Sequence, residues 1–347
     1  MAGDHRAGAP QGLAELAPGL ALALALAVGA QAAAPLVARL APLPALLIAL
    51  LVGIALQPAM GARFQPGLRF CVSRLLRIAV ALLGLKVSLS EIAALGPITG
   101  LLVVVAMVVT IAAGFALARL LGLSRSFGAL AGSATAICGA SAALATSSVL
   151  PPSPARDADT VFVIVAVNLL STVAMLAYPP LARLLGFDDL HTGILLGGSI
   201  HDVAQVVGAG YAVSETAGAT AVIVKLFRVL LLLPAILIIG RMFVGSAEGA
   251  KVPVPVFAFA FLGLCVVNSA MAWLPPVQPL YVPIKAFLSE VSAWGLLVAI
   301  AALGLNTSFE SIAKLGLRHV LVVSGTTLVI LACVVGGLVL EARFGFQ

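Results

Sequence analysis

The sequence predicts an all-α polytopic membrane protein. Of its 347 residues, 62% are hydrophobic and only 9% are charged, whereas about a quarter of the residues of a soluble domain are charged. Apolar runs of about 20 residues, the length that crosses a bilayer, follow one another along the chain. One stretch also recurs later in a similar form. Because so few charges could not keep a soluble surface hydrated, we expect most of the surface to face lipid.

The apolar runs define about eleven transmembrane segments in a single integral membrane domain, 1–347. We expect them at 13–34, 43–59, 67–89, 97–121, 126–149, 158–185, 192–213, 217–244, 255–273, 281–305 and 316–340. Their connections are short and rich in turn formers, such as PPSPARDAD at 151–159. The first segment resembles a secretory signal, but we expect it to be retained as a peripheral helix.

The Lys and Arg residues predict the orientation of the chain. In alternate connections, ten of them fall on the side of the N-terminus and five on the opposite side. Cytoplasmic connections are enriched in these residues, so we expect a cytoplasmic N-terminus and an external C-terminus. The net charge is +6, but the sequence contains no basic block or aromatic platform. We therefore expect the lipid bilayer, and no nucleic acid, as a partner; assembly into a homo-oligomer is left open.

An internal repeat predicts the architecture of a carrier. ALLGLKVSLSEIAALGPITGLLV at 81–103 aligns without gaps to AALGLNTSFESIAKLGLRHVLVV at 301–323, with 11 of 23 positions identical. The copies lie seven segments apart, so they should cross the membrane in opposite directions. Inverted-topology repeats of this kind are typical of secondary transporters. We expect the repeat-related regions to be 43–121 and 255–340, with a central site region at 126–244.

Two segments are unusually rich in small and polar residues. They are ALAGSATAICGASAALATSSVLPP at 129–152 and GILLGGSIHDVAQVVGAGYAVSE at 193–215. Small residues allow close helix packing, which is one explanation of this composition. The other is that these helices are broken or re-entrant, because irregular backbone is tolerated at membrane depth where it lines a protein cavity. A helix that begins there would present free N–H groups suited to an anion.

Ionisable residues gather in the same part of the chain. His201 and Asp202 lie in one Gly/Ser-rich segment, and Lys225 and Arg228 lie in the next apolar segment. A charge within a span costs at least about 2.5–3.5 kcal/mol, so these side chains should face the interior of the bundle. They could form a structural ion pair that holds two helices together. Alternatively, two cations, a histidine and several hydroxyls against one carboxylate favour a small oxyanion, which Arg binds well.

These observations give a set of candidate residues. Those for binding the substrate are Ser133, Thr135, Cys138, Gly139, Ser141, Gly198, Ser199, His201, Gln205, Lys225 and Arg228. His201 and Asp202 are candidates for carrying a coupling proton, and sodium is the alternative coupling ion. Asn168, Ser171 and Thr172 are lesser candidates. The four cysteines are far apart and the sequence has no Walker motif, so we expect no metal and no cofactor.

Two other functions fit parts of this pattern. A cation/proton antiporter could use Asp202 as its ion-binding carboxylate, although the surrounding excess of cations fits an anion better. Ser199, His201 and Asp202 are the residue types of a hydrolase, but a catalytic triad needs a scaffold that the sequence does not indicate. We therefore expect a transporter rather than an enzyme.

The chain resembles the YeiH family of bacterial inner-membrane proteins, whose members are usually labelled sulfate exporters. The resemblance rests on ATAICGASA (134–142), GGSIHDVAQVVGAG (197–210) and IVKLFRVLLLLP (223–234), and LLGLKVSLSEI (82–92) also fits. It covers nearly the whole chain after about residue 40. Asp202 stands where the family pattern leads us to expect Glu. The resemblance implies secondary transport of sulfate or a related sulfur oxyanion or sulfonate in the inner membrane, by a fold similar in plan to inverted-repeat carriers.

Overall fold

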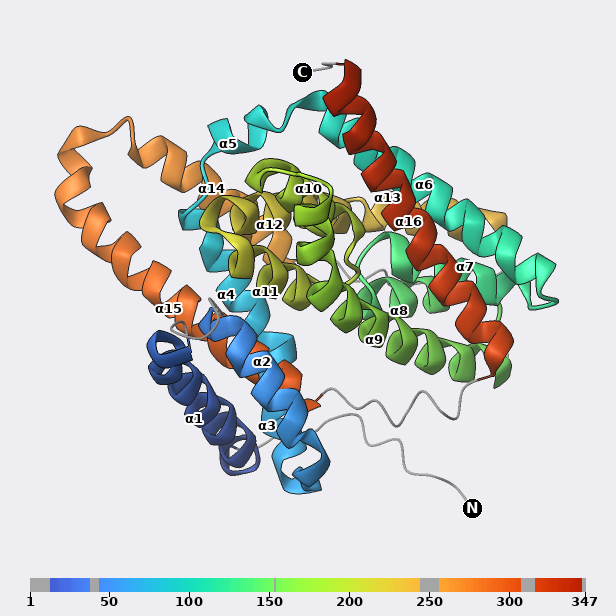
Figure 1. The fold of residues 1–347 in the computed structure, drawn as a ribbon, viewed down its shortest axis with the longest axis horizontal. Helices are drawn as coiled ribbons and strands as arrows, with labels where there is room; N and C mark the ends of the chain where they lie inside the picture. The colour runs from blue at the N-terminus through green and yellow to red at the C-terminus, as the bar shows by residue number, and fades with distance from the viewer. Residues whose placement is uncertain (1–12, 38–43, 153, 244–255, 307–315, 345–347) are drawn as a thin grey trace. The chain divides into compact units, whose positions relative to one another are not determined.

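The structure is a computed structural model and describes residues 13–37, 44–152, 154–243, 256–306 and 316–344 (Figure 1). Within these ranges the regular structure is entirely helical, which confirms the all-α prediction. The helices of the first part of the chain are α1 (Leu13–Val37), α2 (Ala45–Leu56), η1 (Gln57–Ala59), η2 (Ala62–Phe64), α3 (Gln65–Phe70), the π-helix η3 (Cys71–Leu75), α4 (Leu76–Leu82), η4 (Leu83–Leu85), α5 (Leu89–Ala94) and α6 (Gly96–Leu120). Those of the second part are α7 (Arg125–Ala136), α8 (Ala140–Val149), α9 (Pro154–Leu184), α10 (Asp189–Ser199), α11 (Val203–Val213), α12 (Glu215–Leu230), α13 (Leu232–Met242), α14 (Val256–Met271), η5 (Pro275–Val277), α15 (Gln278–Asn306) and α16 (Leu317–Phe344).

The chain divides into two compact units. The first comprises residues 1–80 and 290–308. In its core, small side chains of α1 such as Ala23 and Ala27 pack with Cys71. Gly53 of α2 meets Gly304 of α15, and a Cβ at Gly53 would lie 2.9 Å from the backbone oxygen of Ala301. The absence of a side chain at Gly53 therefore allows these two helices to touch.

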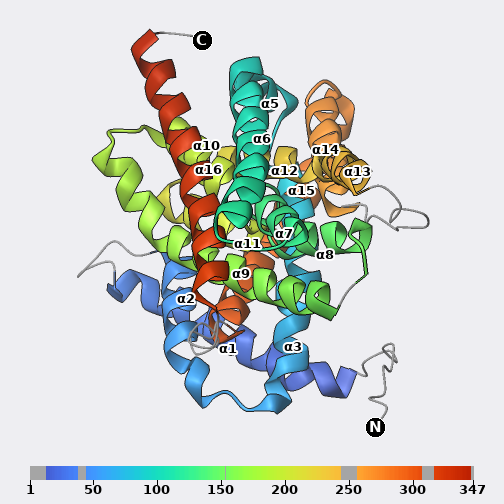
Figure 2. The ribbon, with the colours of Figure 1, turned by 90° about the vertical axis from the view of Figure 1, so that its right-hand side faces the viewer.

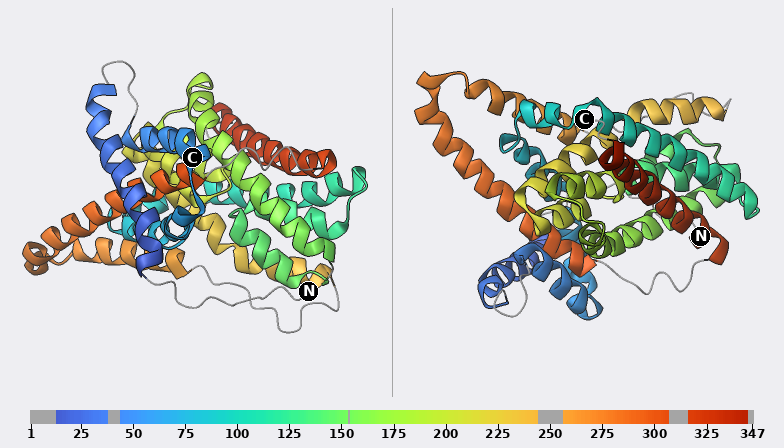
Figure 3. Two further views of the ribbon diagram at one scale, coloured as in Figure 1. Left: turned by 90° about the horizontal axis from the view of Figure 1, so that it is seen from below. Right: turned by 45° about the horizontal axis from the view of Figure 1, so that its top comes forward.

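The second unit comprises residues 81–289 and 309–347 and contains the central helices. In it α16 lies beside α6 in every view (Figures 1, 2 and 3). Helix α12 packs against both α10 and α11, where Gly197 faces the backbone of Ala221 and Gly210 faces Gly218. This packing places one continuous helix, α12, against two consecutive shorter ones.

Six helices of the described chain are long and apolar enough to cross a membrane. They are Ala14–Val37, Gly96–Leu120, Ala158–Leu184, Glu215–Met242, Pro275–Asn306 and Leu317–Arg343. The other expected segments are shorter or interrupted: α2 and α14 have 12 and 16 residues, and 67–89 changes between α, π and 3₁₀ geometry. Eleven crossings therefore stay a prediction.

Both Gly/Ser-rich segments are broken, as their composition predicts. The first consists of α7 and α8, separated at residues 137–139. Gly139 in this break has φ 59° and ψ −119°, a conformation that only glycine adopts without strain. The second segment consists of α10 and α11, separated at residues 200–202. The glycines and serines of these segments therefore include residues that permit interruption as well as residues that permit close packing.

The repeat is described only in part. Its first copy contains the end of α4, the whole of η4 and α5, and the start of α6, with a capping box between Ser88 and Glu91. The second copy contains the end of α15 and the start of α16, and its polar connection at 307–315 lies outside the described residues. The inverted topology stays a prediction.

The contact between α6 and α7 leads to a stability prediction. A Cβ at Gly114 of α6 would lie 2.6 Å from the backbone oxygen of Gly128 and 2.7 Å from the Cα of Gly132. Neither helix backbone can yield locally, so Gly114→Ala should push α6 and α7 apart and cost about 1–3 kcal/mol. Thermal unfolding in detergent, followed by size-exclusion chromatography of the folded fraction, should show a lower midpoint.

The matched control is Gly100→Ala in the same helix. A Cβ at Gly100 would meet no atom within 4 Å, so this variant should unfold at or slightly above the temperature of the unmodified protein. Equal midpoints for the two variants would contradict the packing argument.

Candidate functional site

The two helix breaks lie against each other. We call residues 137–139 and 200–202 together the junction. A Cβ at Gly139 would lie 3.7 Å from the backbone oxygen of His201 and 4.0 Å from the Cβ of Asp202. The junction therefore brings the ends of α7, α8, α10 and α11 into one place.

Lys225 of α12 binds both breaks. Its side chain is completely buried. The Nζ group donates to the backbone oxygens of Ile137 at 2.6 Å, Ile200 at 3.0 Å and His201 at 2.5 Å. An ammonium group has three N–H donors, so all three are used on carbonyls.

Arg228 lies one turn further along α12 and is also completely buried. Its Nε donates to Ala136 O at 2.9 Å, and its Nη2 donates to Thr135 O at 2.9 Å and Ala136 O at 2.7 Å. Its Nη1 donates to Gly197 O and Ile200 O, both at 2.9 Å. A guanidinium group has five N–H donors, and these five bonds engage all of them.

The eight bonds satisfy the C-terminal ends of two helices. The last carbonyls of a helix have no partner within the helix, and this end carries a partial negative charge. Lys225 and Arg228 supply donors and positive charge to the ends of both α7 and α10. The prediction that the two cations face the interior is confirmed by their burial. The expectation that they bind a substrate directly stays untested, and in this structure their N–H groups are occupied by carbonyls.

The N-terminal ends of α8 and α11 differ from each other. Asp202 is the N-cap of α11, and its Oδ2 accepts the N–H of Ala204 at 3.2 Å. Helix α8 begins after Gly139, which has no side chain to act as a cap. Ala140, Ser141 and Asp202 are partly exposed, unlike the two cations. The accessible part of the junction is therefore the part at which helices begin.

His201 connects the junction to α16. Its ring is completely buried, with Nδ1 at 3.2 Å from the backbone oxygen of Thr135 and Nε2 at 3.0 Å from the hydroxyl of Thr327. A carbonyl oxygen only accepts, so Nδ1 must carry the proton. The hydroxyl of Thr327 also lies 2.9 Å from the backbone oxygen of Val323, so its single proton serves either that oxygen or Nε2.

Several of the predicted hydroxyl groups bond within the protein. The hydroxyls of Ser133 and Thr146 lie 2.6 Å apart and connect α7 to α8. That of Thr135 lies 2.9 Å from the hydroxyl of Thr326 in α16. Ser199 donates to Leu195 O of its own helix at 2.5 Å. These bonds use the three serine and threonine side chains for packing between or within helices.

The remaining predicted residues lie in three places. Cys138 and Gly139 lie in the first break, and Cys138 is 5% exposed. Gly198 instead lies against Val334 of α16, whose side chain a Cβ at this position would approach to 3.2 Å. Gln205 bonds to α9, where its Nε2 donates to Asn168 Oδ1 at 3.1 Å. The structure thus brings Thr135, Cys138, Gly139, His201 and Asp202 to the two cations and places Gly198 elsewhere.

Thr326 and Thr327 are not among the residues predicted from the sequence. From α16, Thr327 bonds to His201 in the junction and Thr326 bonds to Thr135 at the end of α7. Helix α16 was expected only as a repeat-related span. A pair of threonines in an otherwise apolar segment is a weak signal, because such residues often bond only within their own helix. Here, too, the hydroxyls of both threonines lie within hydrogen-bond distance of the backbone oxygen of Val323 in their own helix.

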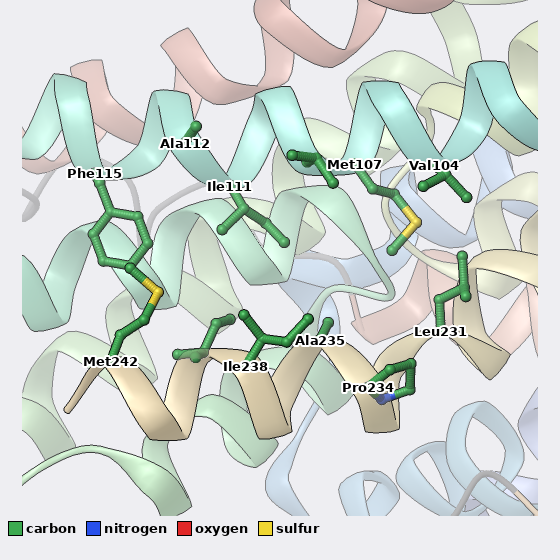
Figure 4. Close-up of a pocket in the computed structure, with 12 residues that line it drawn as sticks. Val104, Met107, Ile111, Ala112, Phe115, Leu231, Pro234, Ala235, Ile238 and Met242 are labelled. Atoms are coloured by element: carbon green, nitrogen blue, oxygen red, sulfur yellow. The ribbon is translucent and has the colours of Figure 1, made fainter. Parts of the chain in front are cut away.

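A separate cavity of about 340 Å³ lies between α6 and α13 (Figure 4). All of its lining side chains are apolar, among them Met107, Ile111 and Ile238. None of the polar residues of the junction contributes to it. This cavity therefore offers no group that could bind an anion.

Comparisons with known proteins identify the family. The family model described as conserved hypothetical protein 698 matches residues 18–323. The UPF0324 membrane protein TauZ of Paracoccus pantotrophus is 41% identical over 284 residues, which are 80% of this chain and 82% of that protein. The UPF0324 membrane protein CT0845 of Chlorobaculum tepidum is 39% identical over 278 residues, which are 79% of this chain and 76% of that protein.

A third relative, the UPF0324 membrane protein RB0971 of Rhizobium meliloti, is 42% identical over 278 residues, 78% of this chain and 79% of its own. No solved structure matches this chain. The relatives are named as membrane proteins, in agreement with the composition and the apolar helices. The chain belongs to the UPF0324 family of membrane proteins, the YeiH-like family that its motifs resemble.

Proposed function

We propose that the protein is a secondary transporter of a small anion, most simply sulfate or a related sulfur oxyanion or sulfonate. The observation that carries the proposal is the junction, in which two broken helices meet and two buried cations bind their C-terminal ends. Broken helices at a binding site are typical of carriers that work by alternating access. The orientation, the eleven crossings, the inverted repeat and the location in the bacterial inner membrane belong to this proposal.

The anion would bind where α8 begins. The first N–H groups of a helix and its positive end attract an anion, and Ser141 adds a partly exposed hydroxyl in that first turn. Lys225 and Arg228 would act through their charge and by holding the breaks in place, because their own donors are bonded to carbonyls. A coupling ion, proton or sodium, would bind at His201 or Asp202.

A cation/proton antiporter is the second candidate. It is favoured by the carboxylate of Asp202, which is partly exposed at the N-terminal end of α11. The surrounding positive groups favour the anion transporter over it. An intramembrane hydrolase has less support, because the hydroxyl of Ser199 donates to its own helix.

Flux measurements test the proposed function. Proteoliposomes that contain the full chain should take up labelled sulfate, sulfite or a sulfonate and show counterflow under an imposed pH or sodium gradient.

Ser141→Ala should weaken the apparent affinity for the anion about tenfold, since a hydrogen bond to a charged group contributes about 1.5–3 kcal/mol. The control is Ser148→Ala in the same helix, because Ser148 donates to Ala145 O and should not affect flux. Sodium or lithium extrusion that depends on Asp202, without anion flux, would contradict the proposal and favour the antiporter.

The role of Arg228 can be separated from substrate binding. In Arg228→Met, the carbonyls of Ala136 and Gly197 lose the donors described above. An unsatisfied buried polar group costs about 1–3 kcal/mol, so this variant should unfold at a clearly lower temperature in detergent without any substrate. Arg241→Met is the control, since Arg241 is exposed on α13. If both variants unfold like the unmodified protein, the carbonyls do not depend on Arg228.

A further inference from the structure

A buried acceptor without a donor lies next to the junction. The side chain of Gln205, on the first turn of α11, is completely buried. Its Nε2 donates to Asn168 Oδ1 at 3.1 Å and lies 3.5 Å from Thr172 Oγ1. Among the residues that the structure describes, no group donates a hydrogen bond to its Oε1. A buried acceptor in this state costs free energy unless something else binds to it.

The bonds around the amide determine its orientation. Thr172 gives its hydroxyl proton to the backbone oxygen of Asn168 at 3.1 Å, so towards Gln205 it can only accept. The amide nitrogen of Gln205 must therefore face Thr172 and Asn168, and the amide oxygen must face away from them. Reversing the amide would set its oxygen against Asn168 Oδ1.

The N–H group that usually donates to a glutamine oxygen at this helix position donates to another acceptor here. Asp202 and Gln205 occupy the N-cap and N3 positions of α11, and at N3 a glutamine often accepts the N–H of the N-cap residue. Here that N–H donates to Ser171 Oγ at 3.1 Å instead. Ser171, Asn168 and Thr172 lie on one face of α9. This face thus accepts the backbone N–H of Asp202 and the amide N–H of Gln205, and within the described part of the chain Oε1 receives no hydrogen bond.

We infer that a sodium ion binds at the first turn of α11, with Gln205 Oε1 and the carboxylate of Asp202 as ligands. Amide and carboxylate oxygens are ligands of hard cations, and the hydroxyl of Ser171, which accepts the N–H of Asp202 at 3.1 Å, adds another oxygen at this turn. One carboxylate among neutral oxygens matches a single positive charge. A divalent cation such as Ca²⁺ usually takes more carboxylates and six to eight oxygens.

The oxygen ligands at the first turn of α11 favour a cation over an anion. An amide oxygen carries partial negative charge and repels an anion, so Gln205 suits a cation better than the anionic substrate for which its sequence context made it a candidate. The positive end of α11 attracts the carboxylate of Asp202, which is its N-cap. Lys225 interacts electrostatically with Asp202, while its three N–H groups are bonded to carbonyls of the two breaks. The inference deepens the proposed function, because it identifies the coupling ion and its ligands.

Sodium binding can be measured without transport. The purified full chain in detergent would be unfolded by heat in NaCl, KCl or choline chloride at one total salt concentration. Because a ligand of the folded state stabilises it, sodium should raise the midpoint saturably, by about 5 °C, and potassium and choline should not. Equal midpoints in the three salts would overturn the inference.

Variants then locate the ion. Gln205→Met should abolish the response to sodium, and Gln205→Glu, which keeps an oxygen at this position, should retain it. The matched control is Gln278→Met, because Gln278 also uses its amide nitrogen in one bond, to Met271 O at 2.6 Å, and lies away from the junction. An unchanged response in Gln205→Met would overturn the inference. If Gln205→Met does not fold, Asp202→Asn tests the site instead, because it removes the charged ligand. This variant should raise the sodium concentration needed for half of the shift at least tenfold. An unchanged concentration would overturn the inference.

The same measurement separates this inference from the proposed function. A sodium-dependent midpoint without anion flux in proteoliposomes would retain the ion site and reject the anion transporter. Anion flux with no response of the midpoint to sodium would retain the transporter and reject the ion site.

Discussion

The structure of the central helices depends on the bonds between two cations and the ends of two helices. Breaking a helix within a membrane leaves carbonyl groups without partners, and the bilayer supplies no water to satisfy them. Lys225 and Arg228 use eight N–H groups on the ends of α7 and α10. A charge within a span is costly by itself, and free carbonyls there are costly too. Each of these two unfavourable features compensates the other, so the breaks and the cations must occur together.

This compensation gives the junction two different sides. At the C-terminal ends of α7 and α10, the partial charges and donors are matched and the cations are buried. At the N-terminal ends of α8 and α11, Asp202 caps one helix, and Gly139 gives the other no side-chain cap. In the proposed transporter, ligands would therefore bind where helices begin, next to the face of α9 that carries Asn168, Ser171 and Thr172. An anion and a coupling cation could bind close together there without competing for one group.

Sequence reasoning predicted the helical class, the two breaks and the burial of Lys225 and Arg228, because composition and spacing carry those signals. It did not predict what the cations bind, since a backbone carbonyl is present at every residue and leaves no mark in the sequence. Thr326 and Thr327 were missed for a related reason: their contacts with Thr135 and His201 depend on where α16 packs. The apolar run at 67–89 also gave no sign of its change to π and 3₁₀ geometry, because these forms have similar composition to an α-helix.

Helix α12 also constrains how the proposed transporter could move. All eight donors belong to α12, and the acceptors belong to the breaks of two other helices, so a displacement of α12 relative to α7 or α10 would expose both cations and carbonyls at once. Close contacts at Gly197 and Gly210 hold α12 against α10 and α11 in addition. Alternating access should therefore carry α7, α10 and α12 together. The hydrogen bonds between α9 and the first turn of α11 are fewer than the eight made by α12, and the α9 side chains in them are neutral. The contact between α9 and α11 is therefore weaker than that of α12 with the breaks. Binding of an ion can change the packing most at this weaker contact.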